Sequence, residues 1–196
     1  MVSQLTAFPL RPARVHEVCG PQAAAFAAVA GAMVEDAVGG GADHILWIRE
    51  NWHSQIIDPS VLAGYLDPAR LLLARTPDQT ETLAVAEDAL RDGAARLVIM
   101  ELSAPLGLTA GRRLQLAAQA GHSTGLCLIP EGMGSPAAET RWLCSALPDP
   151  ERDAEPGDST LQKWELIKNK SGTLGEWHVR WGRSARRLDV VSPAGE

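Results

Sequence analysis

The chain has 196 residues, of which 45% are hydrophobic and 21% charged, and its formal net charge is −6. This length suits a single hydrophobic core, and the composition is that of a folded globular protein rather than a disordered one. The acidic balance excludes non-specific coating of nucleic acid or of an anionic membrane.

The cysteines indicate a reducing compartment. Cys19, Cys127 and Cys144 form no C-x-x-C pair, and the last two stand in apolar runs, which predicts buried thiols rather than a disulfide or a metal site. The sequence shows no signal-peptide pattern, and no apolar run approaches the roughly 18 residues of a membrane span. We therefore expect a cytoplasmic protein without a membrane partner.

The N-terminal two thirds of the chain alternate between strand and helix signals. Apolar runs predict strands near residues 15–18, 45–48, 71–74, 96–101 and 124–129, and apolar residues at helical spacing predict helices that start near Pro21, Asp78 and Thr109. Continuous apolar strands separated by helices are typical of a mostly parallel sheet covered by helices. The predicted fold class is therefore α/β.

The C-terminal third has a different pattern. After a strand near 140–147 and an acidic loop at 148–160, the segments 163–169 and 176–181 alternate apolar and polar residues around two glycines, which predicts an antiparallel hairpin. We expect a lead-in over residues 1–13, one domain over 14–183 and a flexible basic tail over 184–196.

The first strand, the turn at Gly20 and the following helix reproduce the layout of a phosphate-binding P-loop. Pro21 suits the first helical position. A working loop reads G-x-x-x-x-G-K-[ST], and its glycine, lysine and hydroxyl would fall at Ala25, Phe26 and Ala27. Because none of these residues can hold phosphate or Mg²⁺, the sequence predicts a degenerate loop, no cofactor and no enzyme activity. The alternative is an ordinary strand–turn–helix that never held a nucleotide.

Other polar residues give weaker signals. Glu50, Glu101 and Glu131 follow predicted strands, where α/β proteins usually bind ligands, but without a loop lysine they would repel phosphate. The five histidines show no metal-like spacing. Seven Lys or Arg against three acidic residues between 161 and 190 suggest an acidic partner or a DNA backbone, and a solubilising role is the alternative.

Over residues 14–183 the chain resembles the core of RecA-type recombinases and, more closely, the ImuA group of RecA-like proteins from bacterial SOS mutagenesis. The segments that carry the resemblance are Glu17-Val-Cys-Gly-Pro21, Leu66-Asp-Pro-Ala-Arg-Leu-Leu72, Glu87-Asp-Ala-Leu-Arg-Asp-Gly-Ala94, Arg113-Leu-Gln-Leu-Ala-Ala118, Thr140-Arg-Trp142 and Gly175-Glu-Trp-His-Val-Arg-Trp181.

The resemblance implies a role rather than a reaction. ImuA proteins accompany ImuB, a catalytically dead polymerase relative, and an error-prone DnaE-type polymerase in mutagenic DNA synthesis across lesions after DNA damage. Some also interact with RecA. The resemblance thus implies a non-catalytic adaptor in DNA repair that associates with the nucleoid on DNA damage and has an ImuB-like protein, RecA and the polymerase as partners.

Several RecA features are altered in this sequence. Glu101 stands where RecA has a magnesium-positioning aspartate, and Glu131 lies near the place of a nucleotide-sensing glutamine. Only Gly132-Met-Gly-Ser-Pro136 remains of the long loop that holds single-stranded DNA, and few residues precede the first strand where RecA has a polymerising element. We therefore expect weak or absent DNA binding, no hydrolysis and no self-polymerisation.

The C-terminal segment supplies the predicted partner-binding residues. Lys168 and Lys170 match a RecA lysine pair that reaches the neighbouring subunit's nucleotide site, so this surface is a candidate cap for the ATP face of RecA. Solvated hairpin charges are the alternative. The full candidate set is Lys168, Lys170, Trp177, Trp181, Arg183, Arg186 and Arg187.

Two other functions stay open at the level of sequence. One is a residual nucleotide-binding ATPase that uses Glu101 and Glu50 with an unusual loop. The other is a cell-division inhibitor of the SulA type, which would bind the tubulin-like division protein.

Overall fold

The computed structural model describes residues 5, 7–38, 44–149 and 159–191, and within them nine strands form one sheet in the order β3-β2-β4-β5-β1-β6-β7-β8-β9. The strands are β1 (Val15–Cys19), β2 (His44–Glu50), β3 (Leu71–Thr76), β4 (Ala95–Glu101), β5 (Thr124–Leu128), β6 (Thr140–Ala146), β7 (Ser159–Asn169), β8 (Gly175–Gly182) and β9 (Arg187–Val191). The helices are α1 (Ala23–Val38), α2 (Pro59–Leu62), α3 (Gln79–Asp92) and α4 (Leu108–Gly121), with a short 3₁₀ turn, η1, at Pro68–Arg70.

The strand directions confirm the predicted α/β class. All pairings from β3 to β6 are parallel, and those from β6 to β9 are antiparallel. One prediction is wrong: β9 lies within the stretch expected to be a flexible tail. It pairs with β8 residue by residue, from His178 opposite Val191 to Gly182 opposite Arg187. The rest of that predicted tail, from residue 192, lies outside the described residues, as does most of the acidic loop.

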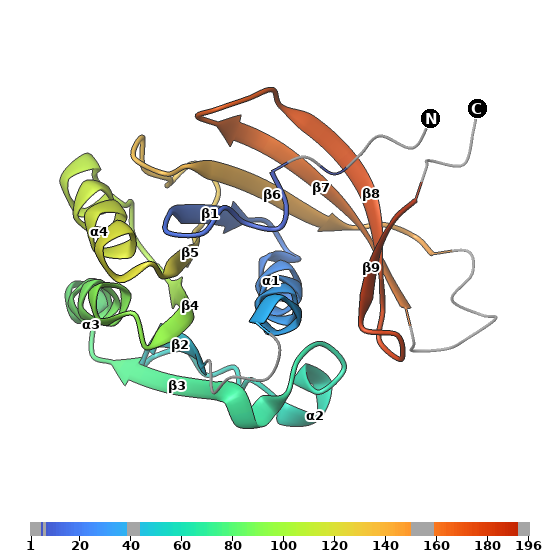
Figure 1. Cartoon of the computed structure of the whole chain (residues 1–196), viewed down its shortest axis with the longest axis horizontal. Coiled ribbons are helices and arrows are strands. Elements are labelled where there is room, and N and C mark those ends of the chain that lie inside the picture. The colour runs from blue at the N-terminus through green and yellow to red at the C-terminus, as the bar shows by residue number, and fades with distance from the viewer. Residues whose placement is uncertain (1–4, 6, 39–43, 150–158, 192–196) are drawn as a thin grey trace.

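Helices cover the two faces of the sheet unequally (Figure 1). Helices α3 and α4 pack side by side on one face of the parallel half, while α1 lies on the other face, inside the curve made by the antiparallel strands. The apolar residues accordingly form two clusters, one on each face. The cluster around α1 contains most of the aromatic side chains.

Local signals explain where α3 begins and ends. The Asp78 carboxylate accepts a hydrogen bond from the Glu81 backbone N–H at 3.0 Å, which caps the first turn. Gly93 ends the helix in the left-handed region at φ 81°, and a side chain there would collide with the carbonyl of Gly121 at the end of α4. α4 begins next to the predicted start at Thr109, with Leu108 as its first residue and Gly107 at its N-cap.

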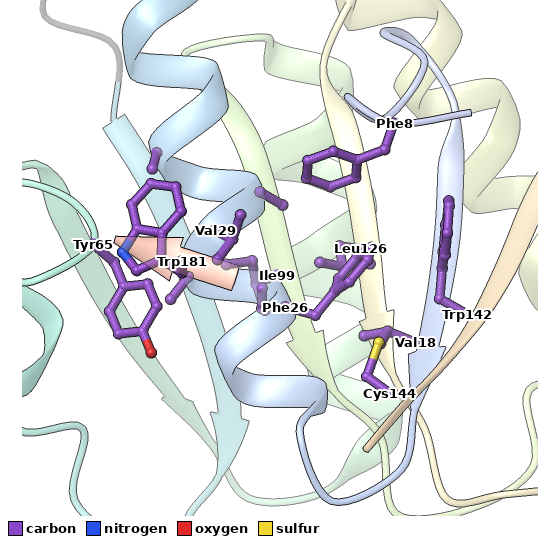
Figure 2. Close-up of a cluster of buried hydrophobic side chains, with 14 of the residues drawn as sticks. Phe8, Val18, Phe26, Val29, Tyr65, Ile99, Leu126, Trp142, Cys144 and Trp181 are labelled. Carbon is purple, nitrogen blue, oxygen red and sulfur yellow. The ribbon is translucent and has the colours of Figure 1, made fainter. Parts of the chain in front are cut away.

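The centre of the α1 cluster is aromatic (Figure 2). Phe26 contacts Trp164 at 4.6 Å and Trp142 at 5.5 Å between ring centroids. Phe8, from the predicted lead-in, lies 5.0 Å from Trp164 and 5.5 Å from Phe26 and is itself buried. The segment before β1 is therefore part of the core rather than a loose extension.

Candidate functional site

The turn after β1 is built for close packing against β6. Gly20 has φ +90°, and a Cβ there would lie 2.5 Å from the carbonyl oxygen of Cys144, so only glycine fits. The Gln22 N–H donates to that same carbonyl at 3.1 Å, the Ala23 N–H donates to Gly20, and the Phe26 N–H donates to Gln22. In a P-loop, backbone N–H groups point at phosphate. In this turn, by contrast, the three backbone N–H groups donate to carbonyls of the protein.

Phe26 and Ala27 occupy the lysine and hydroxyl places of a P-loop, and both are completely buried. Figure 2 shows the Phe26 ring directed from α1 into the space between the helix and the sheet. α1 starts at Ala23, so Ala25 already lies in the helix rather than in a phosphate-encircling loop. Pro21 precedes the helix and is exposed.

The carboxylate at the end of β4 is held by groups of the protein. Glu101 accepts hydrogen bonds from Trp47 Nε1 at 2.8 Å and from the Arg49 guanidinium at 2.9 Å, and it lies 3.5 Å from His53 Nε2. Arg49 also donates to the carbonyl of Gln55 at 2.6 Å. Glu101 is therefore part of a largely buried ion pair.

The three glutamates that follow strands have different surroundings. Glu50 accepts hydrogen bonds from Trp52 Nε1 at 2.7 Å and Ser103 Oγ at 2.5 Å, whereas Glu131 lies exposed in the turn after β5. Within the described ranges, no group of three or more His, Cys, Asp or Glu residues is placed to hold a metal ion. Glu50 and Glu101 therefore have hydrogen-bond partners within the protein.

A cavity of about 560 Å³ opens at this edge of the sheet. The first turn of α1, the ends of β2, β4 and β5, and the segment that includes α2 form its walls. It occupies the place where a nucleotide would lie against a P-loop, at the carboxyl ends of parallel strands. Its lining is mainly apolar, with Ala24, Ala25 and Ala28 on one side and Ile56, Ile57, Val61, Leu62 and Tyr65 on the other.

The short loop that follows β5 is pinned to the sheet. Buried Glu17 accepts hydrogen bonds from the Ser135 N–H and from Arg141 Nε, both at 2.7 Å. Lys168 Nζ donates to the carbonyls of residues 136 and 138 at 2.8 and 2.6 Å, and Lys170 Nζ donates to that of Ala137 at 2.6 Å. A segment with this many anchors is poorly suited to closing over DNA.

Lys168 and Lys170 both have partners within the chain, with Lys168 half-buried and Lys170 exposed. Burial, with the nearby Arg141 guanidinium, lowers the pKa of Lys168. Each ammonium group already satisfies backbone carbonyls of its own chain. A RecA-capping role would require both lysines to release these carbonyls first.

The two tryptophans predicted to bind a partner are buried, and this corrects the prediction. Trp177 is 6% exposed and lies 5.9 Å from the Trp142 ring. Trp181 is 1% exposed, stacks on Tyr65 at 5.7 Å and donates from Nε1 to the carbonyl of Gly64 at 2.8 Å. Alternate residues of β8 face α1, so the apolar alternation seen in the sequence marks the core face.

The three arginines of the candidate set lie at the turn between β8 and β9. The Arg183 guanidinium sits 5.9 Å from the centre of the Tyr65 ring, and Arg186 donates to the carbonyl of Ala63 at 3.1 Å. Arg187 pairs with Asp189 at 2.9 Å. Arg186 and Arg187 are exposed, so they stay the accessible part of the predicted partner surface.

Sequence reasoning missed three buried polar groups: Arg49, Glu17 and His16. Their partners are far away in the sequence, so no local spacing marks them. His16 donates from Nε2 to the Arg11 carbonyl at 3.0 Å and accepts from the Thr140 hydroxyl at 2.7 Å. Burial lowers the pKa of His16 to about 4, so it is neutral near pH 7.

The fold and the site together define a RecA-like domain with a P-loop position that is closed by helix and core packing. The crystal structure of the RadB recombinase superposes with a TM-score of 0.62 and 14% identity, covering 92% of each chain. No protein-family profile matches the chain. Among the helices of the described residues, none is both long enough and apolar enough to cross a bilayer.

Curated relatives confirm the resemblance to ImuA. The chain is 29% identical over 160 residues to Protein ImuA from two strains of Caulobacter vibrioides, NA1000 / CB15N and ATCC 19089 / CIP 103742 / CB 15. The match covers 80% of this chain and 59% of the relatives. The chain thus spans about three fifths of the length of the curated relatives it matches.

Proposed function

We propose that the chain is a non-catalytic RecA-like adaptor of the SOS mutasome, which supports error-prone translesion DNA synthesis. Its proposed partners are an ImuB-like protein, a DnaE-type polymerase and RecA, and its proposed place is the cytoplasm, at the nucleoid after DNA damage. The similarity to ImuA over 80% of the chain supports this assignment.

The burial of Phe26 carries the non-catalytic part of the proposal. A P-loop lysine must reach the phosphates, but the residue in its place is 0% exposed among aromatic rings. Substitution at this one position cannot recreate the site, because the turn N–H groups also bond to protein carbonyls. Glu101, which stands where RecA has a magnesium-positioning aspartate, is paired with Arg49 at 2.9 Å.

Titration of the full chain with labelled ATP and Mg²⁺ tests this part directly. We expect no saturable binding at millimolar ATP, while RecA in the same buffer serves as the positive control. Saturable binding that competes with unlabelled ATP, or any turnover above the buffer rate, would refute the adaptor proposal and favour a residual ATPase.

Co-purification tests the partner assignment. Tagged chain, expressed with the ImuB-like protein, RecA and the division protein of the same cell, should retain one of the first two and not the third. The double variant Arg186→Glu, Arg187→Glu tests the exposed β8–β9 turn as the contact, with Arg112→Glu on α4 as a matched charge reversal elsewhere. Retention of the division protein alone would contradict the mutasome role.

A further inference from the structure

Exposed apolar side chains surround the mouth of the 560 Å³ cavity. Ile56 is 83% exposed and Val61 51% exposed, and both line the cavity. Trp52 is 61% exposed and stacks at 4.0 Å on His53, another lining residue. A contiguous group of this kind at the edge of an apolar cavity marks an interaction site, since scattered surface hydrophobics do not converge on one opening.

The cavity is open because small side chains form one of its walls. Ala24, Ala25 and Ala28 present only methyl groups along the first turns of α1, opposite Tyr65 and Leu62. A volume of about 560 Å³ lies within the range of pockets that enclose compact ligands. It can therefore take large apolar side chains that project from a partner.

The wall opposite α1 is held in place before any partner arrives. The Asp58 carboxylate caps α2 by accepting from the Ser60 N–H at 2.8 Å, and Arg49 holds the Gln55 carbonyl at 2.6 Å. At the far end of α2, Trp181 holds the Gly64 carbonyl. Binding to a preformed wall loses less conformational entropy than binding to one that must first be ordered.

Charged groups of both signs lie around the mouth: carboxylates near the start of α2 and after β5, and Arg183 and Arg186 against Tyr65 and the Ala63 carbonyl at the end of α2. Arg49 and Glu101 neutralise each other inside the cavity at 2.9 Å, so the remaining lining carboxylate is Asp58 at the rim. Glu131 directly follows the lining residue Pro130 and is exposed. A bound segment is therefore expected to place its cations beside Asp58 and Glu131, away from the two arginines, and an acidic residue there would be repelled.

We propose that this cavity is the docking site for a partner protein segment that inserts an apolar anchor side chain and flanks it with Lys or Arg. The inference rests on the adaptor function proposed above and names the chemistry of one contact. Ile56 and Val61 cover the anchor, Ala24 and Ala28 receive it, and Asp58 and Glu131 meet the flanking cations. Protein interfaces usually place apolar anchor side chains in a desolvated pocket and charged groups at the rim.

Three fluorescein-labelled peptides of equal length test the proposal by fluorescence anisotropy with the full chain. The first has two leucines four residues apart between lysines, the second has glutamates in place of the lysines, and the third has serines in place of the leucines. We expect the first to bind at least about tenfold more tightly than either of the others. Its affinity should fall as salt rises, because the rim charges are exposed.

Substitutions on the protein locate the binding. Ile56→Asn removes an exposed apolar contact without adding charge, and Ala24→Trp fills the cavity from an exposed position on α1; each should weaken the first peptide about tenfold or more. Asp58→Asn removes the charge but keeps an N-cap residue, so it should reduce the salt dependence. Leu116→Asn is the matched control, because Leu116 is 67% exposed on α4 and lines no part of the cavity.

Four results would overturn the proposal. The first is binding of the leucine–lysine peptide that Ile56→Asn and Ala24→Trp leave unchanged, and the second is tighter binding of the glutamate peptide. The third is no binding up to about 1 mM, and the fourth is a concentration-dependent dimer that Ile56→Asn abolishes. The last result would assign the surface to a second copy of this chain. None of them alters the outcome of the ATP titration or of co-purification, so failure of this site is distinguishable from failure of the adaptor function.

Discussion

Replacement of Phe26 tests the central structural claim, that the residue at the position predicted for a P-loop lysine supports the core. Phe26 is completely buried and contacts three aromatic rings at centroid distances of 4.6 to 5.5 Å. Truncation of such a residue to alanine removes buried apolar area and leaves a cavity, at a cost of about 3–5 kcal/mol. We take about 4 kcal/mol as the expected loss for Phe26→Ala.

That loss is large compared with the whole stability of a domain, which is about 5–15 kcal/mol. Urea unfolding followed by tryptophan fluorescence and circular dichroism measures it, and Leu116→Ala provides a surface control expected to change stability by less than about 0.5 kcal/mol. The physical reason for the contrast is burial, since Leu116 is two-thirds exposed.

Phe26→Lys is a stricter test, because it restores the lysine of the P-loop sequence pattern but not the phosphate-binding structure around it. We expect this variant to unfold or to be less stable than Phe26→Ala, since an isolated ammonium would enter an apolar cluster. It should not gain ATP binding. A loss below about 1 kcal/mol for Phe26→Ala, or ATP binding by a folded Phe26→Lys chain, would show that this position does not support the core as described.

Three further predictions follow from buried polar groups. Burial lowers the pKa of His16 from 6.5 to about 4, so the unfolded chain binds a proton that the folded chain does not; stability should fall as pH drops from 6.5 towards 4, by up to about 3 kcal/mol. His16→Gln should remove that part of the pH dependence in urea titrations, and an unchanged slope would contradict the assignment. Arg49→Leu should cost about 3–5 kcal/mol because it leaves Glu101 buried without its partner, while adding Glu101→Leu should recover much of the loss; additive costs would refute this coupling. The double variant Lys168→Met, Lys170→Met should raise amide hydrogen exchange in residues 131–138 and leave that of α3 unchanged. Equal exchange of residues 131–138 in the double variant and the parent would mean that the lysines do not hold the loop.

Much of the parallel half of the fold could be predicted because its signals are local. The apolar runs placed β2 and β4 within a residue or two, and Asp78 and Gly93 bounded α3 as capping residues should. β9 escaped prediction because its residues are only half-buried, and at such an edge position pairing with β8 decides the structure. Edge strands carry weak sequence patterns for this reason.

The candidate site, like the fold, has some features that residue types predict and others that depend on tertiary contacts. The degenerate loop was visible from residue types, because Phe and Ala have no chemistry for phosphate. The burial of Trp177 and Trp181, and the use of Lys168 and Lys170 as loop anchors, could not be seen, because each depends on a partner far away in the sequence.

By itself the sequence determined the order of strands and helices through β8 and the glycine turn after β1, because each depends on neighbouring residues and their intrinsic preferences. Only the tertiary structure decided which face of β8 meets α1, which carbonyls the lysines hold and that an apolar cavity opens beside α2. Those outcomes arise from packing between segments separated by tens of residues, and no local pattern encodes such contacts.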